Sequence, residues 1–552
     1  MTLLAAPAVC RTALSGAALL VLLAVPSGAQ VELSHTDDAA PIPRGMLRLR
    51  ITNAWTRYDQ RYGPNGLVQS GDALSADPLG VAQFPLLAPV EASLQSLAAN
   101  PRTRLSLGRL VTSADTRIVT TPVAVEYGLS RRLSVGVVVP VVQTRRTVGV
   151  RVNQDGSPAN VGLVPFTLRS AAALRNDSAG NSATVAAAQL AALIGRCPAG
   201  SGAPECARVN ADPGAAAATL ARAQQLAAGA RALGTTTAAA IIAPRATGTV
   251  ALEIELQRNA LNRQLQDFLG AGAAQATAVY FAPTDFSYAD FQGRDGTPGL
   301  LQSPLGGGVD SIRTTERIGF GDITIGAQYL LFDRFQRDEL PPSGGLQARV
   351  AIGGSVRLAT SRADTVTNLV DIGTGDGGGV EVRGAMDLLR GRVGGTLAVR
   401  YARSSSRAVS APLSGDPDAA FPAAPFGMRQ RRAGDVLGLD VTPRYLLTDL
   451  FALDGHYGLE RIGTATYEGG SGGGGAACAL TNCAAAESAT RTAQRLGIGL
   501  RYSTVDAHAR GRARYPFEVS FVHLTTISGD VGTPNLTRDQ IQLRLFYRLF
   551  GR

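Results

Sequence analysis

The most constraining feature of this sequence is the alternation of side chains along residues 540–550. Apolar side chains stand at every second position, and they are Ile541, Leu543, Leu545, Tyr547 and Leu549. The positions between them carry Gln540, Gln542, Arg544 and Arg548. Because successive side chains of a β-strand point to opposite faces, the segment predicts a strand with one apolar and one polar face. Such a closing strand, behind an N-terminal export signal, is typical of an outer-membrane β-barrel.

Residues 1–29 have the organisation of a secretory signal peptide. Arg11 supplies the positive charge, residues 13–25 are apolar, and Ser27-Gly28-Ala29 provides small residues for cleavage. A retained membrane anchor is the alternative, but the apolar stretch is short for a bilayer that takes about 20 residues of helix. We therefore expect a mature chain of residues 30–552.

The remainder of the chain excludes several classes of protein. No later segment has about 18 uninterrupted apolar residues, so membrane-spanning helices are not expected, and a soluble secreted protein or a β-barrel remains. The net charge is +10, and all 53 basic residues are arginine. Because these arginines alternate along strands rather than gather in one patch, we expect no nucleic-acid partner.

A second segment, residues 346–360, defines the register of alternation. Its apolar face carries Ala348, Val350, Ile352, Val356 and Leu358, and its polar face carries Gln347, Arg349, Ser355 and Arg357. A slip by one residue would expose both arginines to lipid, at a cost of about 2–4 kcal/mol for each one near the midplane. The same alternation recurs at residues 47–55, 322–329, 380–388, 392–401, 437–445, 451–460, 495–503 and 517–521.

The lengths of the connections predict the topology. Tight turns at 128–131, 390–391 and 448–449 alternate with long polar stretches at 59–102, 152–315, 361–377, 404–433 and 466–490. Bacterial barrels have short periplasmic turns and long outer loops. This pattern predicts an all-β fold, a transmembrane antiparallel up-and-down β-barrel of about 12 strands with both termini in the periplasm. Fourteen strands result if residues 102–127 or 276–290 hold another hairpin.

A soluble β-sandwich would show the same alternation of side chains. Tyrosines near the strand ends favour the barrel, because a barrel carries aromatic girdles at the two membrane interfaces. These tyrosines are Tyr127, Tyr329, Tyr401, Tyr445, Tyr457 and Tyr502.

Residues 152–315 differ from the rest and form an insert between the third and fourth strands. Residues 186–195, 215–233 and 250–269 are Ala-rich and lack strand alternation, so they predict helices in an outer loop. Pro213 suits a helix start. The insert is either a cap or plug over the mouth of the barrel or a tolerated surface insertion.

Four of the five cysteines form two close pairs, Cys197 with Cys206 and Cys478 with Cys483. Exported proteins keep disulfides in an oxidising compartment, so we expect two disulfides in outer loops. The spacings match no usual zinc finger and no histidine lies near either pair, so we expect no metal.

The polar faces of the strands predict the residues that line the lumen. These are Arg48, Arg50, Asp322, Arg349, Arg357, Arg400, Asp440, Arg444, His456, Arg501, Glu518 and Arg544. They form either a polar ring that favours anions or an interlocked charge network that fills a narrow barrel. Val138, Pro140 and Val142 make the inner face of residues 133–142 unusually apolar, which either a lateral path for apolar solutes or simple packing would require.

Catalytic motifs are weak in this sequence. His456 shares a strand face with Asp454, but no serine context completes a hydrolase site. Residues 373–379 are Gly-rich but lack the Lys-Ser/Thr of a phosphate-binding loop. We expect no enzyme activity, catalytic residue or cofactor.

Two motifs resemble one family of outer-membrane proteins. Residues 125–140 (VEYGLSRRLSVGVVVP) resemble the hairpin of the MetA-pathway phenol-degradation group, and residues 319–326 (GFGDITIG) resemble its strand opening. That group is allied to the long-chain fatty acid and toluene uptake barrels. The resemblance implies a passive channel for small, hydrophobic or aromatic solutes in the outer membrane of a Gram-negative-type bacterium, with membrane lipid as its other partner.

Two further functions stay open. One is a structural or adhesive barrel with a closed lumen, and the other is a barrel-embedded hydrolase. The sequence leaves the oligomeric state open.

Overall fold

The computed structural model describes residues 38–198, 201–235, 241–294, 296–335, 345–362, 368–375, 377–412, 421, 426–468, 486–487 and 489–548. The expected signal peptide and the pair Cys478 and Cys483 lie outside these residues.

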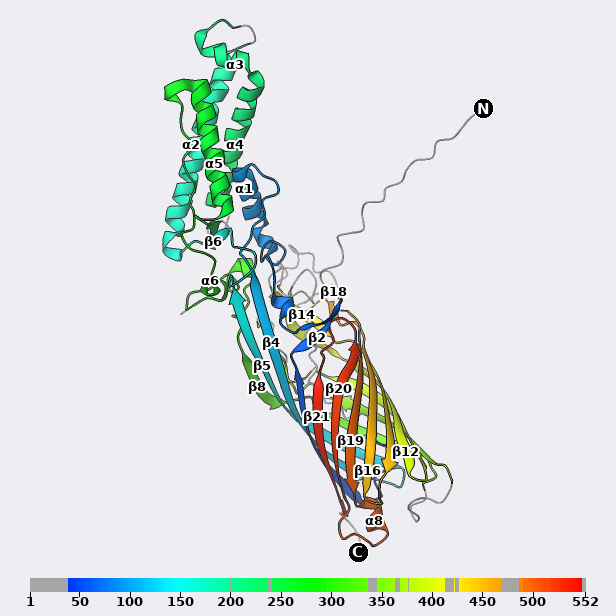
Figure 1. The fold of residues 1–552 in the computed structure, drawn as a ribbon. Coiled ribbons are helices and arrows are strands. Elements are labelled where there is room, and N and C mark those ends of the chain that lie inside the picture. The colour runs from blue at the N-terminus through cyan, green and yellow to red at the C-terminus, as the bar shows by residue number, and fades with distance from the viewer. Residues whose placement is uncertain are drawn as a thin grey trace, which may run out of the picture.

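The strands close into one antiparallel barrel, as the alternation predicted (Figure 1). The order around the barrel is β4-β1-β21-β20-β19-β16-β15-β12-β11-β10-β9-β5, and pairing of β4 with β5 closes the ring. The strands are β1 (Met46–Tyr58), β4 (Leu110–Gly128), β5 (Leu133–Val152), β9 (Thr324–Asp333), β10 (Gln347–Arg357), β11 (Gly379–Arg390), β12 (Val393–Ser404), β15 (Val436–Leu446), β16 (Phe451–Ile462), β19 (Arg491–Ser503), β20 (Phe517–Gly529) and β21 (Thr537–Arg548). The count of 12 strands is confirmed.

Two consecutive strands, β8 and β9, pair one after the other with the same edge of β5. The strand β8 (Thr315–Phe320) pairs with β5 from Val141 to Arg146, and β9 pairs with β5 from Leu133 to Val138. The chain passes from β8 to β9 through residues 321–323, so the ladder along β5 is interrupted at Val139 and Pro140. The ladder on this side of β5 is therefore discontinuous at this point.

The closing strand shows that the polar face points inward. Ile541 and Tyr547 are 44% and 52% exposed on the outside, whereas Gln540, Gln542 and Arg544 are 2–4% exposed. The same holds for β10, where Ile352 and Val356 are exposed. In the membrane, these exposed apolar side chains face lipid and every backbone group of a closed barrel finds a partner within the sheet.

The two ends of the barrel differ in their connections. The links β4–β5, β11–β12 and β15–β16 are short and lie at the end of the barrel where β21 finishes (Figure 1). The helix α8 (Val505–Ala509) lies at this end too. The long connections gather at the other end, which is the outer end in the expected orientation.

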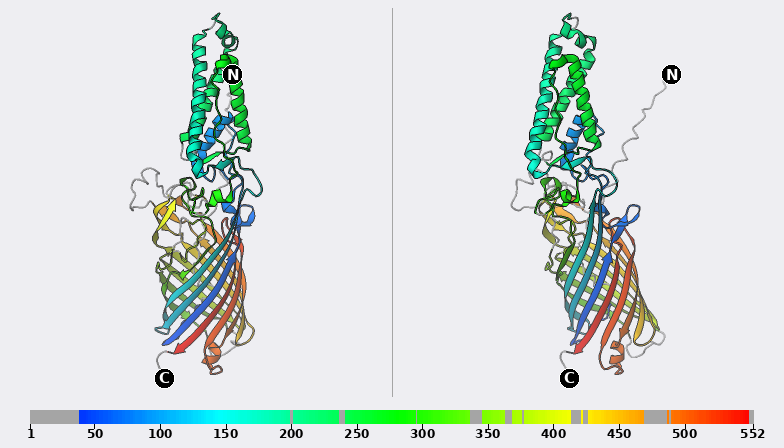
Figure 2. Two further views of the ribbon diagram at one scale, coloured as in Figure 1. Left: turned by 90° about the vertical axis from the view of Figure 1, so that its left-hand side faces the viewer. Right: turned by 60° about the vertical axis from the view of Figure 1, so that its left-hand side comes forward.

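The outer end carries a helical bundle. It comprises α1 (Ala88–Ala98), α2 (Arg169–Arg196), α4 (Pro213–Thr235) and α5 (Thr249–Leu269), with α3 (Ala207–Ala211) at its tip and α6 (Tyr288–Gln292) at its base. Figure 2 shows the bundle projecting away from the barrel beyond the ends of β4 and β5. It has its own apolar core, which includes Leu94, Leu190, Leu226, Leu261 and Leu265.

Smaller strands complete the outer end. They are the hairpin β2 (Gln60–Gly63) and β3 (Gly66–Gln69), the pair β6 (Val161–Leu163) and β7 (Ile242–Pro244), and a sheet of β13 (Ser406–Pro412), β14 (Phe426–Arg432), β17 (Thr466–Glu468) and β18 (Ala486–Glu487). Among the described residues, no helix is long and apolar enough to cross a membrane.

Close packing of small residues explains why α2 is longer than expected. The helix begins at Arg169 rather than Ala186, although residues 176–181 are mostly poor helix formers. A Cβ at Gly180 would lie 2.6 Å from Arg231 Cγ, so α4 passes very close. Asn176 also donates to the carbonyl of Leu233 (3.3 Å) and accepts from the Tyr280 amide (2.8 Å). Contacts with α4 and with Tyr280 thus stabilise the helix here, although residues 176–181 have low helix propensity.

A disulfide joins Cys197 to Cys206, nine positions later in the sequence, at the tip of the bundle. We expect replacement of both cysteines by serine to destabilise the tip by about 2–3 kcal/mol, since the cross-link limits the unfolded loop. Hydrogen exchange of the amides of α3 would measure the change, with the amides of β16 as an internal control. Unchanged exchange in α3 would contradict the prediction.

Candidate functional site: the lumen of the barrel

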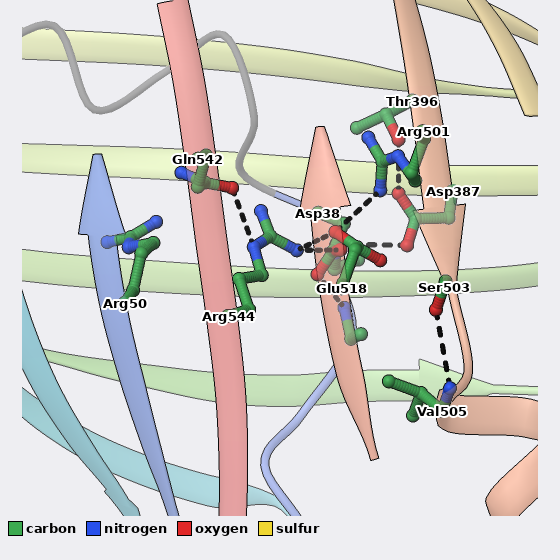
Figure 3. Close-up of polar contacts among 12 residues, drawn as sticks. Asp38, Arg50, Asp387, Thr396, Arg501, Ser503, Val505, Glu518, Gln542 and Arg544 are labelled. Carbon is green, nitrogen blue, oxygen red and sulfur yellow. Dashed lines mark hydrogen bonds and ion pairs between the residues drawn. The ribbon is translucent and has the colours of Figure 1, made fainter. Parts of the chain in front are cut away.

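The lower lumen, toward the end with the short turns, contains a continuous chain of ion pairs. Asp454 on β16 accepts from Arg444 Nε (2.8 Å) and from Arg501 Nε (3.1 Å). Glu518 on β20 then lies 3.3 Å from both Arg501 and Arg544 (Figure 3). The chain of charges therefore connects β15, β16, β19, β20 and β21 across the inner wall.

Three further acidic residues pair with five more arginines of the wall. Asp387 accepts from Arg349 Nε (2.6 Å) and from the hydroxyl of Thr396 (2.7 Å). Glu126 pairs with Arg48 (2.5 Å) and Arg50 (3.5 Å), and Glu460 pairs with Arg400 (2.5 Å) and Arg495 (3.3 Å). Buried charges are costly unless they are paired, so these contacts explain how the lumen holds so many guanidiniums.

The segment from Asp38 to Gly45 precedes β1 and runs inside the barrel. The carboxylate of Asp38 lies 3.0 Å from Arg544 Nη1, and its carbonyl accepts from Gln328 Nε2 (3.2 Å). The Ala39 amide donates to Asp387 (3.0 Å). Ala39 is fully buried against Ala351 and Ala385, whose small side chains leave room for the backbone. The segment thus occupies the lumen and joins charges on opposite walls.

A glycine lets this segment enter the lumen. The Gly45 amide donates to the Gly128 carbonyl (2.9 Å) at the short-turn end. A Cβ at Gly128 would lie 2.2 Å from the Pro43 carbonyl oxygen, so only glycine allows this approach.

A cavity of about 690 Å³ opens below the segment at the short-turn end. Charged side chains on its wall include Arg349, Arg501 and Arg544, and apolar side chains include Phe335, Leu446 and Phe546. The cavity can therefore accept a molecule that has both apolar and polar parts.

Higher in the barrel, β5 presents an apolar inner face. Val138, Pro140 and Val142, which we call the apolar patch, are all buried. Gly321, in the link between β8 and β9, donates its amide to the Pro140 carbonyl (2.8 Å). A Cβ at Gly321 would lie 2.9 Å from Pro140 Cγ and 3.2 Å from Val142 Cγ2. The apolar patch therefore lies directly behind the interruption of the wall.

The outer loop between β10 and β11 covers this region. Thr144 donates to the Ile372 carbonyl (3.4 Å), Arg317 pairs with Asp371 (2.7 Å), and Thr374 donates to the Phe320 carbonyl (2.9 Å). Val370, Ile372 and Thr374 are 0–2% exposed. Residues 368–375 thus fold into the mouth and pack against β5 and β8.

The twelve residues predicted to line the lumen are all buried or half-buried, and their role in the lumen stays a prediction. Eight of the twelve belong to the ion pairs above, and the other four have separate contacts. Asp322 accepts from the amides of Ser361 (3.0 Å) and Gly377 (2.8 Å) and so anchors the outer loop. Arg357 donates to Ser404 Oγ (3.1 Å). Asp440 and His456 are 8% and 4% exposed.

Two residues of this site, Glu126 and Asp38, lie outside the alternating segments recognised in the sequence. Glu126 stands at an inward position of β4, so the period of two could have identified it. Asp38 precedes the first strand, where no periodicity applies, and only its charge marks it.

The geometry around His456 does not favour a hydrolase. Its Nδ1 lies 3.3 Å from Thr442 Oγ1. Both oxygens of Asp454 accept from guanidiniums, so this carboxylate is committed to Arg444 and Arg501. Among the residues that the structure describes, no three His, Cys, Asp or Glu side chains form a group that could hold a metal ion.

No protein-family model and no curated protein sequence matches this chain. The resemblance to the MetA-pathway group therefore stays a prediction. Solved structures of outer-membrane proteins are similar at low identity. The COG4313 outer membrane channel from Pseudomonas putida F1 is 8% identical, with 92% of this chain and 98% of that chain covered and a TM-score of 0.40.

Two other solved structures cover similar shares of this chain at lower TM-scores. A Pseudomonas aeruginosa FadL homologue is 8% identical, with 92% of this chain and 90% of that chain covered and a TM-score of 0.28. The toluene transporter TbuX of Ralstonia pickettii is 10% identical, with 92% and 89% covered and a TM-score of 0.26.

Proposed function

We propose that this protein is a passive channel for small, hydrophobic or aromatic solutes. A closed barrel with an apolar exterior is the form in which strands cross the bacterial outer membrane, so the fold implies that location. The observation that carries the proposal is the apolar patch of β5. It lies behind the interruption between β8 and β9, where a solute could enter or leave through the wall.

The charged lumen supports the same proposal. The axis of the lower barrel contains the segment Asp38 to Gly45 and the ion pairs around it. A hydrophilic solute would have to displace these contacts, whereas an apolar solute at the wall would not. The cavity at the short-turn end, with both apolar and charged walls, would receive the solute on the inner side.

A polar side chain in the apolar patch should slow transport. We expect Val142→Asn to lower the uptake rate of naphthalene by roughly tenfold, because an amide without partners costs about 1–3 kcal/mol in an apolar path. Uptake by liposomes that contain the purified protein would be measured with radiolabelled solute.

Val522→Asn is the matched control for this test. Val522 is an equally buried valine of the inner wall, 2% exposed against 0% for Val142, but it belongs to β20. It is separated from β5 by β4, β1 and β21. Equal losses in the two variants would argue against a path along β5.

The second candidate is a structural or adhesive barrel with a closed lumen. The inserted segment and the ion pairs favour it, since together they obstruct the axis of the lower lumen. Uptake by the unmodified protein equal to that of empty liposomes, with no conductance steps in planar bilayers, would support this candidate over a channel.

A further inference from the structure

We propose that the lumen contains an oxyanion-binding site at its outer end, where the long connections lie. Arg61, Arg146 and Arg491, which we call the arginine cluster, would bind the carboxylate or phosphate group of a molecule with an apolar body. The inference rests on the proposed function in one respect, namely that such a molecule is a transported solute.

Strand register brings the cluster together. Arg146 of β5 is opposite Thr116 of β4, and Thr116 is opposite Tyr58 at the end of β1. Arg61 follows three residues later in β2 and forms a bridge with Pro534. The neighbouring Thr533 donates to the carbonyl of Thr492 (3.2 Å), directly after Arg491 at the start of β19. The three arginines therefore come from separate strands around one mouth.

Two of these arginines are buried without a partner among the described residues. Arg146 is 3% exposed, and its Nε and Nη1 have no hydrogen-bond partner. Arg61 is 6% exposed, and its Nε has none. The hydroxyl of Thr116, between them in the same row, is fully buried and also lacks a partner. Unpaired buried donors of this kind are costly, and an oxyanion satisfies them directly.

Arg61 and Arg146 differ from the arginines of the lower lumen in their lack of ion pairs. The arginines of the lower wall pair with carboxylates at 2.5–3.5 Å. Arg61 and Arg146 have no ion pair with any described carboxylate. Burial lowers the pKa of Arg61 to about 10; the charge of Asp72 opposes this shift, and the positive charges of Arg146 and Arg491 add to it. Arg61 and Arg146 thus bring positive charge, without an ion-pair partner among the described residues, into a region that excludes most of the solvent.

An apolar surface adjoins the cluster. Tyr58, Ile118, Val142 and Leu536 form a buried apolar group. Val142 lies four residues before Arg146 on the same face of β5, and it belongs to the apolar patch. A guanidinium fork binds a planar carboxylate or a phosphate through two hydrogen bonds, while the apolar group can receive a ring or chain. The arrangement therefore fits an anionic head with an apolar body better than a free inorganic ion.

The test is direct binding of 2-naphthoate to the purified full-length protein in detergent, measured by titration calorimetry. The neutral analogue 2-naphthalenemethanol and inorganic phosphate are the two comparison ligands. We expect 2-naphthoate to bind at least tenfold more tightly than the neutral analogue, because only the carboxylate accepts charge-assisted hydrogen bonds from the arginines. We expect it to bind at least tenfold more tightly than phosphate, because only 2-naphthoate has an apolar ring to bury.

Variants on one strand separate the site from a general charge effect. Arg146→Gln should weaken 2-naphthoate binding about tenfold or more, whereas Arg145→Gln should not. Arg145 is the next residue on β5, but its side chain is 56% exposed on the other face, near Glu316. Arg61→Gln is the second variant, with Arg57→Gln as its exposed control, and gel mobility of the unheated barrel shows that each variant folds.

Each outcome decides the proposal. Loss of 2-naphthoate binding in Arg146→Gln and Arg61→Gln alone supports it. Equal affinity for phosphate and 2-naphthoate would contradict the proposal that the site recognises an apolar body. Equal affinity for the neutral analogue and 2-naphthoate would contradict the proposal that the site binds an oxyanion. Because binding is measured without a membrane, failure of the transport proposal would leave these results unaffected.

Discussion

Replacement of Asp454 by asparagine should lower the free energy of unfolding by about 3–5 kcal/mol. The side chain is 2% exposed and neutralises two guanidiniums, Arg444 and Arg501. Asparagine keeps the shape but removes the charge, so both cations stay in the lumen with less compensation. Of the two, only Arg501 also pairs with Glu518 at 3.3 Å. The loss should be measured in detergent as the shift in denaturant at which the folded band disappears from unheated gels.

Asp115→Asn is the matched control. Asp115 also pairs with two arginines, Arg57 (3.3 Å) and Arg117 (3.1 Å), but both of these are more than 60% exposed. Solvent screens such pairs, so the variant should lose at most about 1 kcal/mol. If the two variants lose equal stability, the lumen network is not what stabilises the barrel.

The strands could be predicted from the sequence because each one must present an apolar face to lipid and a polar face to the lumen. A slip in register would turn Arg349 and Arg357 toward lipid, so alternation alone determines which face is inward. Alternation does not determine which inward residues meet. Asp38 and Arg544 are separated by 506 positions, and their contact depends on closure of the ring and on the path of a segment without periodicity.

The outer end was less predictable for a different reason. Residues 88–98 form α1 within a stretch expected to be a loop, although Val90, Leu94 and Leu97 have helical spacing. The helix is short, and its stability comes from packing in the core of the bundle rather than from its own propensity. The arginine cluster was also missed, because Arg61 lies in a hairpin that folds over the mouth and Arg491 lies at a strand end.

Replacement of Asp38 by alanine should open the lumen. The inserted segment is held by the ion pair of Asp38 with Arg544, the amide of Ala39 on Asp387, and the amide of Gly45 on Gly128. A hydrogen bond between charged groups contributes about 1.5–3 kcal/mol, so its loss should raise the ratio of withdrawn to inserted segment by about ten- to a hundredfold. Planar-bilayer recordings should show more frequent and longer open intervals.

The same variant should leave the barrel wall stable, because Arg544 keeps its pair with Glu518 at 3.3 Å. Asp506→Ala is the control, since Asp506 lines the same cavity but has no ion pair with a described residue. Removing that carboxylate changes the charge of the cavity by the same amount without releasing the segment. An equal rise in open intervals in both variants would mean that charge in the cavity, and not the inserted segment, limits conduction. A rise in Asp38→Ala alone would show that the inserted segment limits passage along the axis, and solute uptake in the same variant would then separate an axial route from the route along β5.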